Sequence, residues 1–408
     1  MSKWEEKRLE DIIDVNPPVK LKKGESYPFI DIDKVSPTRR SVTNGEVKVY
    51  DGQSSSKFCD GDTVFSRITP CLENRKIAKV AIEGDAAFGS TEFYVFRAKK
   101  KKADARFTYY LTSSDAVVLP AINSMTGASG RQRADKRFIQ RLKLNLPDLP
   151  TQERIADILS AYDDLIEVNN RRIELLEQTV QELYKEWFVR FRFPGYENAK
   201  FEDGIPEGWS YVRFGKAIDI IDGDRGVNYP KQEEFYPEGD CLFLNAGNVT
   251  TKGFDFSSCA YITKEKDAIL RKGKVQHGDV LLTTRGTVGN VAFYNETMTF
   301  SEMRINSGMV ILRNLGVVSP EYIYTSLRHE YLQKLMTMYA SGSAQPQLPI
   351  KDMKRMKIIK PDTKTMERFT EMSADIYNQI SLLIMKNQTL AKQRDMLLPR
   401  LMSGKLEV

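Results

Sequence analysis

Two stretches of the chain carry an apolar residue at every seventh position, with a companion row offset by three or four residues. A repeat of this period keeps one seam of a helix against a partner helix and is typical of coiled coils. It predicts one long helix over residues 151–191 and a second close to the C-terminus. The alternative is two amphipathic helices, each packed on its own domain. The predicted seam comprises Leu159, Ile166, Asn169, Ile173, Val180 and Trp187 in the first helix and Phe369, Ile376, Leu383, Asn387, Leu390 and Leu397 in the second.

Each long helix follows a stretch with a mixed pattern. Short runs rich in β-branched and aromatic residues alternate with Gly, Asn and Asp turns, which predicts strands. One helix is also expected in each stretch, at 105–118 and at 320–338, the latter with Ser319 as N-cap and Pro320 as its first residue. The pattern indicates α+β domains with a strongly twisted or partly closed sheet. The predicted strands cover 27–33, 76–82, 92–96, 241–244, 280–284, 291–294 and 309–312.

The two halves of the chain resemble each other. Short motifs recur in the same order and at a nearly constant offset, although each single match is weak, and this combination indicates a duplication. The matches join 4–9 with 209–214, Gly61-Asp62 with Gly278-Asp279, Arg67 with Arg285, 146–148 with 360–362, and 153–154 with 367–368. The predicted order is a mixed domain at 1–150, a long helix at 151–193, a second mixed domain at 194–361 and a second long helix at 362–408.

The long helices are expected to pair with each other in antiparallel orientation, because each seam carries one Asn. The register that sets Asn169 opposite Asn387 also sets Trp187 on Phe369 and Tyr162 beside Arg394. A buried Asn pair weakens a seam but fixes its register. The result would be two similar domains related by an approximate two-fold axis. A helix of about 38 residues spans roughly 57 Å, or on the order of 15 base pairs of DNA, which suits a reader of two separated half-sites.

Composition narrows the class of protein. With 61 basic and 55 acidic residues the formal net charge is +6, which is only mildly basic. A polyanionic partner would therefore have to bind to local clusters of basic residues. The apolar runs are too short to cross a bilayer, and the start of the chain has no apolar signal region. The four cysteines form no C-x-x-C pair, which argues against a disulfide framework and a cysteine-based zinc site. We expect a soluble, reduced, cytoplasmic protein.

The sequence offers little for catalysis. Its two histidines, His277 and His329, have no plausible metal-ligand neighbour and are expected to be ordinary imidazoles. An Asn-Pro-Pro motif at 16–18 lacks the aromatic fourth residue of amino-group methyltransferases and predicts a turn, and no phosphate-binding loop of the type GxxxxGK[ST] occurs. We therefore predict no catalytic residue and no metal site.

Basic and polar residues cluster in the mixed domains. A Gly-rich loop at 126–130 is followed by the basic stretch 131–143, and a similar loop at 341–347 precedes further basic residues. Such loops allow close backbone approach to phosphate, while Arg and Gln can hydrogen-bond guanine and adenine edges. The ends of two predicted strands add polar residues, whereas the lysines at 99–102 are more typical of a solvated face. The candidate DNA contacts are Arg67, Ser129, Arg131, Gln132, Arg133, Lys136, Thr283, Thr284, Arg285, Arg304, Ser343, Gln345, Gln347 and Lys351.

Three segments resemble a known family. The stretch PDLPTQERI at 147–155, the long helix, and WFVRFRFPG at 187–195 are similar to the central conserved region of type I restriction-modification specificity subunits. The stretch LLPRLMSGKL at 397–406 is similar to the C-terminal conserved region of the same family, and the resemblance extends over essentially the whole chain. The second helix departs from the family pattern at Met366-Glu367, where Gln-Glu is usual.

The resemblance implies a non-catalytic subunit with two target-recognition domains, each of which reads one half of a split DNA site. It also implies that the long helices dock two modification (methyltransferase) subunits, with restriction (motor-nuclease) subunits joining the complex. S-adenosylmethionine, ATP and magnesium would belong to those partners, and this chain would hold no cofactor. Two alternatives remain: a self-contained DNA-modifying or nuclease enzyme, and a tandem-repeat scaffold that does not bind DNA.

Overall fold

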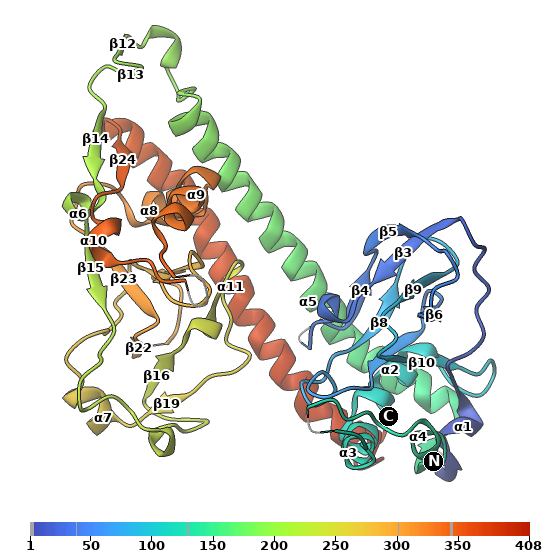
Figure 1. Cartoon of the computed structure of the whole chain (residues 1–408). Helices are drawn as coiled ribbons and strands as arrows, with labels where there is room; N and C mark the ends of the chain where they lie inside the picture. Colours follow the sequence, from blue (N-terminus) through green and yellow to red (C-terminus); the bar gives the residue numbers. More distant parts are fainter. Residues whose placement is uncertain (1–3, 38, 129, 301, 343–345) are drawn as a thin grey trace. The chain divides into compact units, whose positions relative to one another are not determined.

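The computed structural model describes residues 4–37, 39–128, 130–300, 302–342 and 346–408 (Figure 1). The chain divides into two units. Unit 1 comprises residues 1–167 and 389–408, and unit 2 comprises residues 168–388. Each unit therefore combines one mixed domain with a segment of each long helix.

Unit 1 contains two sheets and a two-stranded pair. The larger sheet has the strand order β2-β10-β7-β8-β4, the smaller one has the order β5-β3-β9-β6, and β1 pairs with β11. The strands are β1 Trp4–Arg8, β2 Ile13–Val15, β3 Ser26–Ile30, β4 Ser41–Thr43, β5 Glu46–Val49, β6 Ser56–Phe58, β7 Thr63–Ser66, β8 Ile77–Ala81, β9 Ala87–Gly89, β10 Phe93–Ala98 and β11 Lys143–Pro147. The short helices are α1 Leu9–Ile12, η1 Ile32–Lys34, α2 Ala105–Ser113, α3 Asp115–Asn123 and α4 Lys136–Gln140.

The central strands of unit 1 are buried on both faces, which explains why they read as continuous apolar runs rather than alternating ones. On β7, Val64 belongs to the core shared with the smaller sheet, whereas Phe65 belongs to the core under the helices. The ring of Phe65 meets that of Phe96 edge to face at 5.1 Å. Helix α2 covers this second face, where it contacts β7, β8 and β10.

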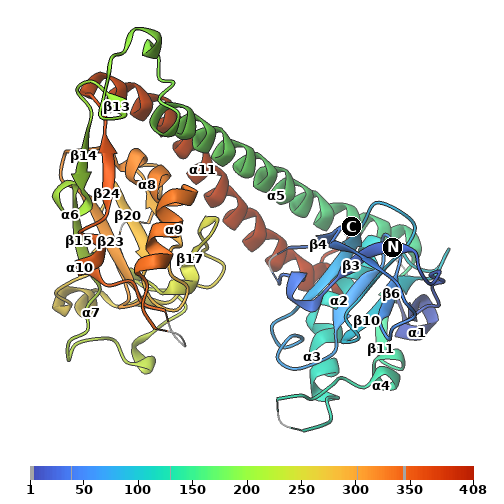
Figure 2. The same cartoon turned by 45° about the horizontal axis from the view of Figure 1, so that its top comes forward.

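Unit 2 has the same arrangement of sheets, with longer loops between its strands. Its larger sheet has the order β15-β23-β20-β21, its smaller one the order β19-β16-β22, and β14 pairs with β24. Helix α8 packs on β20, as Figure 2 shows, and also contacts β21. The strands are β12 Phe201–Glu202, β13 Ile205–Pro206, β14 Ser210–Arg213, β15 Ile218–Asp222, β16 Cys241–Leu244, β17 Val249–Thr250, β18 Gly253–Phe254, β19 Tyr261–Ile262, β20 Asp279–Thr283, β21 Val291–Tyr294, β22 Met303–Ile305, β23 Met309–Asn314 and β24 Lys357–Lys360. The short helices are η3 Tyr196–Asn198, α6 Phe214–Ala217, η4 Gln232–Glu234, η5 Ala246–Asn248, α7 Lys264–Ile269, α8 Pro320–Arg328, α9 Glu330–Tyr339 and α10 Ile350–Met353.

The strand orders confirm the predicted duplication. The order β2-β10-β7-β8 in unit 1 recurs as β15-β23-β20-β21 in unit 2, and the antiparallel pair β1–β11 recurs as β14–β24. Even the parallel pairing of β3 with β9 has its counterpart in β16 with β22. The fold class is therefore α+β, with the same mixed domain used twice.

Two predicted helices are each broken in the middle. The stretch predicted at 105–118 forms α2 and α3, separated by Ser114, and the one predicted at 320–338 forms α8 and α9, separated by His329. Both separating residues have extended backbone angles, and each serves as the N-cap of the next helix. The Ser319 cap of α8 is confirmed, because its Oγ accepts from Tyr322 N at 3.2 Å.

The long helices are α5, Leu149–Tyr184, which continues into the π-helical turn η2, Lys185–Val189, and α11, Thr363–Met402. In unit 2 their segments pair in the predicted register. Asn169 Nδ2 donates to Asn387 Oδ1 at 2.7 Å, and the rings of Trp187 and Phe369 lie 6.2 Å apart. All the predicted seam residues are buried or half-buried.

The predicted setting of the Arg394 head group was wrong. The sequence predicts a guanidinium that stays in water, whereas in unit 1 it pairs with Asp163 and the Arg394 side chain is 23% exposed. The reason is that a buried carboxylate on α5 gives the guanidinium a charged partner inside the protein.

Replacing Asn387 with Leu is expected to destabilise unit 2 by about 1–3 kcal/mol, because the buried Asn169 amide would lose its partner. Replacing Asn169 and Asn387 together with Leu should recover part of this loss, since the buried Asn169 amide is then removed and only the half-buried Asn170, which accepts from Asn387 at 2.9 Å in the wild type, loses a partner. Urea denaturation of the three proteins measures the difference. A double variant less stable than the single one would contradict the pairing.

Candidate nucleic-acid interface

In unit 1 the end of β7 is tied to the Gly-rich loop that sequence analysis selected. Ala134 N donates to Arg67 O at 2.8 Å, and Thr69 N donates to Gln132 O at 3.0 Å. The loop closes on itself through two hydrogen bonds between Thr126 and Arg133, of 3.1 and 2.9 Å. The predicted strand end and the predicted loop therefore form one polar surface.

Unit 2 has the same arrangement at the end of β20. Leu348 N donates to Thr284 O at 2.9 Å, Gly286 N donates to Pro346 O at 3.1 Å, and Ser341 and Gln347 exchange two hydrogen bonds of 2.9 and 2.8 Å. We call each strand end with its loop the tip of its unit. The tips consist of the described residues of 67–69 and 126–134 in unit 1 and of 284–286 and 341–348 in unit 2.

The tips correct one match of the sequence repeat. Arg67 was predicted to correspond to Arg285, but Arg67 accepts from Ala134 in the position where Thr284 accepts from Leu348. Arg285 instead corresponds to Ile68, since these two residues form the equivalent bridges to Gln347 and Arg133. The sequence match was off by one residue because it aligned the two arginines rather than the strand ends.

A buried ion pair anchors the strand that leads to each tip. In unit 1 the nearly inaccessible carboxylate of Asp62 accepts two hydrogen bonds from Arg97, each of 2.6 Å. In unit 2 Asp279 accepts from Arg313 at 2.9 and 2.7 Å. The preceding glycines of both units have positive φ values that other residues rarely adopt. The scaffold below the tips is thus the same in both units, and it explains the recurring Gly-Asp motif.

A comparison with known proteins shows to which family this chain belongs. The model of the family described as "Type I restriction modification DNA specificity domain" matches residues 1–178 and 206–390. The chain belongs to this family.

Relatives match over nearly the full length of the chain. The type I restriction enzyme MjaIX specificity subunit of Methanocaldococcus jannaschii is 24% identical, covering 99% of this chain and 94% of its own. The HindI specificity subunit of Haemophilus influenzae is 24% identical over 88% of this chain and 90% of its own. Among solved structures, a type I restriction-modification S subunit from M. genitalium is 14% identical, with 98% of this chain and 96% of that chain covered and a TM-score of 0.52, which supports the fold.

The chain is therefore a specificity subunit of a type I restriction-modification system. Its role is DNA sequence recognition, and it is not an enzyme. Its partners are DNA and other subunits of the system. Among the described residues, no helix is long and apolar enough to span a membrane.

The tip of unit 1 in this specificity subunit contains a charged cluster that sequence analysis identified only in part. Glu92 lies directly before β10 and binds two of the predicted DNA contacts: Arg67 Nε at 3.2 Å and Arg133 Nη2 at 2.7 Å. The hydrogen bond from Arg133 lowers the pKa of the Glu92 carboxyl, against the opposing effect of burial. Glu92 was missed because it is distant in sequence from both arginines and no charge cluster surrounds it.

The other predicted contacts of unit 1 lie outside this charged cluster. Arg131 is exposed and Gln132 is half-buried in the Gly-rich loop. Lys136 is the first residue of α4, whose N-cap Asp135 accepts from Phe138 N at 2.7 Å. Ser129 lies outside the described residues, as do Ser343 and Gln345 of the second loop.

The tip of unit 2 carries different side chains. Gln347 is exposed in the loop, and Lys351 is exposed on α10. Arg285 is half-buried, and its Nε is inaccessible and has no hydrogen-bond partner among the described residues. The backbone of Arg285 forms a bridge with Gln347, which keeps this arginine at the tip of unit 2.

Three predicted contacts of unit 2 are wrong. Arg304 is only 6% exposed, because Asp267 and the carbonyl groups of Lys272 and Asp267 bind its guanidinium inside the domain. Thr283 and Thr284 are also buried, and their hydroxyls donate to the carbonyl oxygens of Asn290 and Gly308, which directly precede β21 and β23. These residues support the tip but do not present their side chains to DNA.

The histidines and cysteines, all of which the structure describes, occupy ordinary structural positions. His277 hydrogen-bonds the carbonyl of Asn295 at 2.9 Å and stacks on Tyr294, while His329 caps α9. The four cysteines, all within the described ranges, are free thiols. No group of His, Cys, Asp or Glu residues that could hold a metal ion occurs in the described part of the chain.

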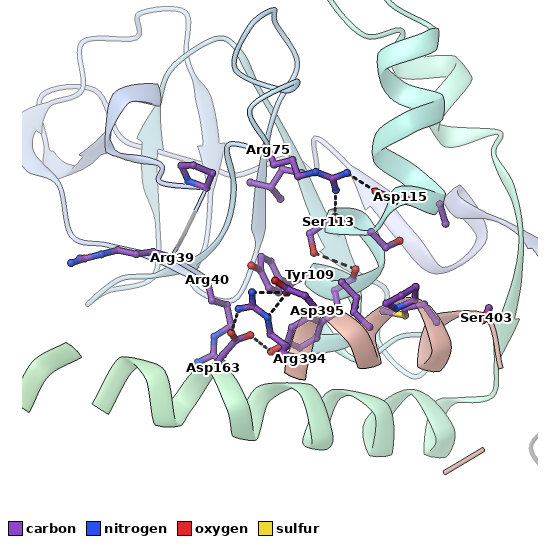
Figure 3. A pocket seen from close by; sticks show the side chains of 18 residues that line it. Arg39, Arg40, Arg75, Tyr109, Ser113, Asp115, Asp163, Arg394, Asp395 and Ser403 are labelled. Carbon is purple, nitrogen blue, oxygen red and sulfur yellow. Dashed lines mark hydrogen bonds and ion pairs between the residues drawn. The ribbon is translucent and has the colours of Figure 1, made fainter. Parts of the chain in front are cut away.

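A cavity of about 490 Å³ lies in unit 1 beside the long helices (Figure 3). Several of its charged residues are paired. Asp163 accepts from Arg394 and, at 2.5 Å, from Tyr110 Oη, while Arg75 pairs with Asp115, and Arg40 pairs with Asp164 and Glu167 outside the lining. Burial raises the pKa of Tyr110. The contacts of Asp163 join α2 to α5 and α11, so we assign these side chains to structural support of unit 1.

Proposed function

We propose that this specificity subunit reads a two-part DNA sequence, with the tip of each mixed domain contacting one half of the site. The observation that supports this best is the contrast within the duplication. The scaffold below the tips is equivalent, with Asp62–Arg97 in unit 1 and Asp279–Arg313 in unit 2, whereas the side chains on the tips differ. Equivalent scaffolds with different tips suit two readers of different base sequences.

We further propose that catalysis resides in partner subunits: two modification subunits that dock on the long helices, and restriction subunits that complete the complex. S-adenosylmethionine, ATP and magnesium would be bound there. The segments of α5 and α11 in unit 2 keep Val168, Leu175 and Leu382 exposed. Exposed apolar side chains on such helices are consistent with docking of a partner protein.

The affinity of the full-length chain for duplex DNA is expected to fall steeply with salt, because binding to phosphates releases counterions. Replacing Arg131 and Lys136 together with Ala should reduce the slope of log K against log[salt] by up to about 0.9 for each phosphate that is no longer neutralised. The matched control replaces Lys100 and Lys101 with Ala, which removes the same charge at the opposite end of β10. Fluorescence anisotropy across a salt series measures both slopes. Salt-independent binding, or equal slope changes in both variants, would contradict the proposal.

Arg285→Ala is expected to alter base preference in one half-site only, with a cost of about 1–3 kcal/mol at the affected position. The reason is the position of Arg285 at the tip of unit 2, where it forms a bridge with the exposed Gln347. Binding of the variant to a panel of singly substituted target duplexes measures the effect. An equal loss on every duplex would instead identify Arg285 as a phosphate contact.

A further inference from the structure

The duplication allows the side chains at equivalent tip positions to be compared within one molecule. Arg67 N donates to Glu92 O at 2.9 Å, and Thr284 N donates to Gly308 O at the same distance. The backbone positions are therefore equivalent, although their side chains differ. Where unit 1 has Arg67, Glu92 and Arg133, unit 2 has Thr284, Gly308 and Gln347.

The three side chains of unit 1 form one cluster at the surface. The Glu92 carboxylate accepts from Arg133 through Nε at 2.9 Å and Nη2 at 2.7 Å, and from Arg67 through Nε at 3.2 Å. The side chains of Glu92, Arg67 and Arg133 are 21%, 30% and 44% exposed. Two guanidinium groups and one carboxylate leave the cluster with a net positive charge, so it remains attractive to DNA.

Arg67 is held on two sides. Its Nε is bound by Glu92, and its guanidinium carbon lies 5.5 Å from the centre of the Tyr94 ring. Tyr94 is itself fixed, because its hydroxyl donates to Ala134 O at 2.7 Å in the Gly-rich loop. The two terminal nitrogens of Arg67 make no hydrogen bond to any residue that the structure describes. They form the planar fork that matches the O6 and N7 acceptors of guanine in the major groove.

We propose that Arg67 reads a guanine in the half-site of unit 1, and that Glu92 and Arg133 are positioning residues that hold its guanidinium in place before DNA binds. This inference rests on the proposed function of the tips. Holding the side chain in advance reduces the ordering that binding requires. Both oxygens of Glu92 already accept from Arg133 and one of them also accepts from Arg67, so we assign the carboxylate to holding Arg67 rather than to accepting from a cytosine amine. Unit 2 has no such cluster among its described residues. We therefore expect no guanine in its half-site that is required for this reason.

The test is selection of bound duplexes from a randomised DNA pool by the full-length chain, followed by sequencing. The wild-type chain should enrich a two-part motif with a required guanine in one half. Arg67→Lys keeps the charge but lacks the fork, so it should reduce the preference for that guanine by about 5- to 150-fold. Glu92→Gln should weaken the preference at the same position while it increases binding to unrelated DNA, because a negative charge is removed.

The matched control is a substitution in the tip of unit 2. Gln347→Ala should change only the other half of the motif, and retention of that half in the Arg67 and Glu92 variants shows that the protein is still folded. An unchanged guanine preference in Arg67→Lys overturns this inference alone. A loss of preference in both halves in Glu92→Gln also overturns it, because Glu92 would then support the whole fold. A wild-type pool without any enriched sequence overturns the proposed function as well.

Discussion

Replacing Phe369 with Ala is expected to lower the free energy of unfolding of unit 2 by about 3–5 kcal/mol. The side chain is fully buried on α11. Its ring lies 5.0 Å from Phe188 and 6.2 Å from Tyr322, and it also packs against Trp187. These neighbours belong to η2 and α8, so the substitution would leave a cavity where both long helices meet the mixed domain of unit 2. Rigid aromatic neighbours cannot collapse fully into such a cavity, which places the cost high in the usual range.

Urea denaturation followed by tryptophan fluorescence measures this loss, since Trp187 and Trp209 both lie in the affected core. The matched control is Met372→Ala on the same helix, where the side chain is 46% exposed. The control should change stability by no more than about 0.5 kcal/mol. A Phe369 variant no less stable than the control would contradict the packing described for unit 2.

Asp163→Ala is expected to cost unit 1 about 3 kcal/mol, the lower end of the range for breaking a buried ion pair. Asp163 is only 3% exposed and accepts from Tyr110 on α2 and from Arg394 on α11. Figure 3 shows Asp163 and Arg394 directed toward each other beside the cavity. The cost is at the lower end because Arg394 keeps a second partner in Asp395, at 2.7 Å.

The neighbouring residue offers a matched control. Asp164 pairs with Arg40, but its side chain is 62% exposed, so Asp164→Ala should cost less than about 1 kcal/mol. Hydrogen exchange of peptides from α2 would localise the effect, since only the Asp163 variant should loosen that helix. Equal losses in the two variants would contradict the account of Asp163 as the link among three helices.

The long helices could be predicted because their signal is local and periodic. An apolar row of period seven identifies the seam, and one Asn in each row is sufficient to select the register in which Asn169 meets Asn387. The duplication was also readable, since Gly-Asp turns with buried carboxylates at Asp62 and Asp279 leave a recognisable motif. These features depend on residues close in sequence or on a repeated pattern.

The side-chain chemistry of the tips could be predicted only in part. The Gly-rich loops and the strand ends were selected from composition, and the structure joins them in both units. Whether an arginine faces solvent or the interior depends, however, on partners that are distant in sequence. No local sequence pattern predicts that Asp267 binds Arg304, or that Glu92 binds Arg67 and Arg133. Helix breaks at Ser114 and His329 escaped prediction for a related reason, since neither residue is a helix breaker by type.

We propose above all that this chain gives a restriction-modification complex its two-part DNA specificity. The most direct measurement is genome-wide mapping of methylated bases in host cells with and without the gene for this chain. We predict a motif of two short halves separated by an unread gap of fixed length, with methylation in both halves abolished when the gene is deleted. Methylation that persists without the gene, or a gene-dependent motif that is continuous, would contradict the account.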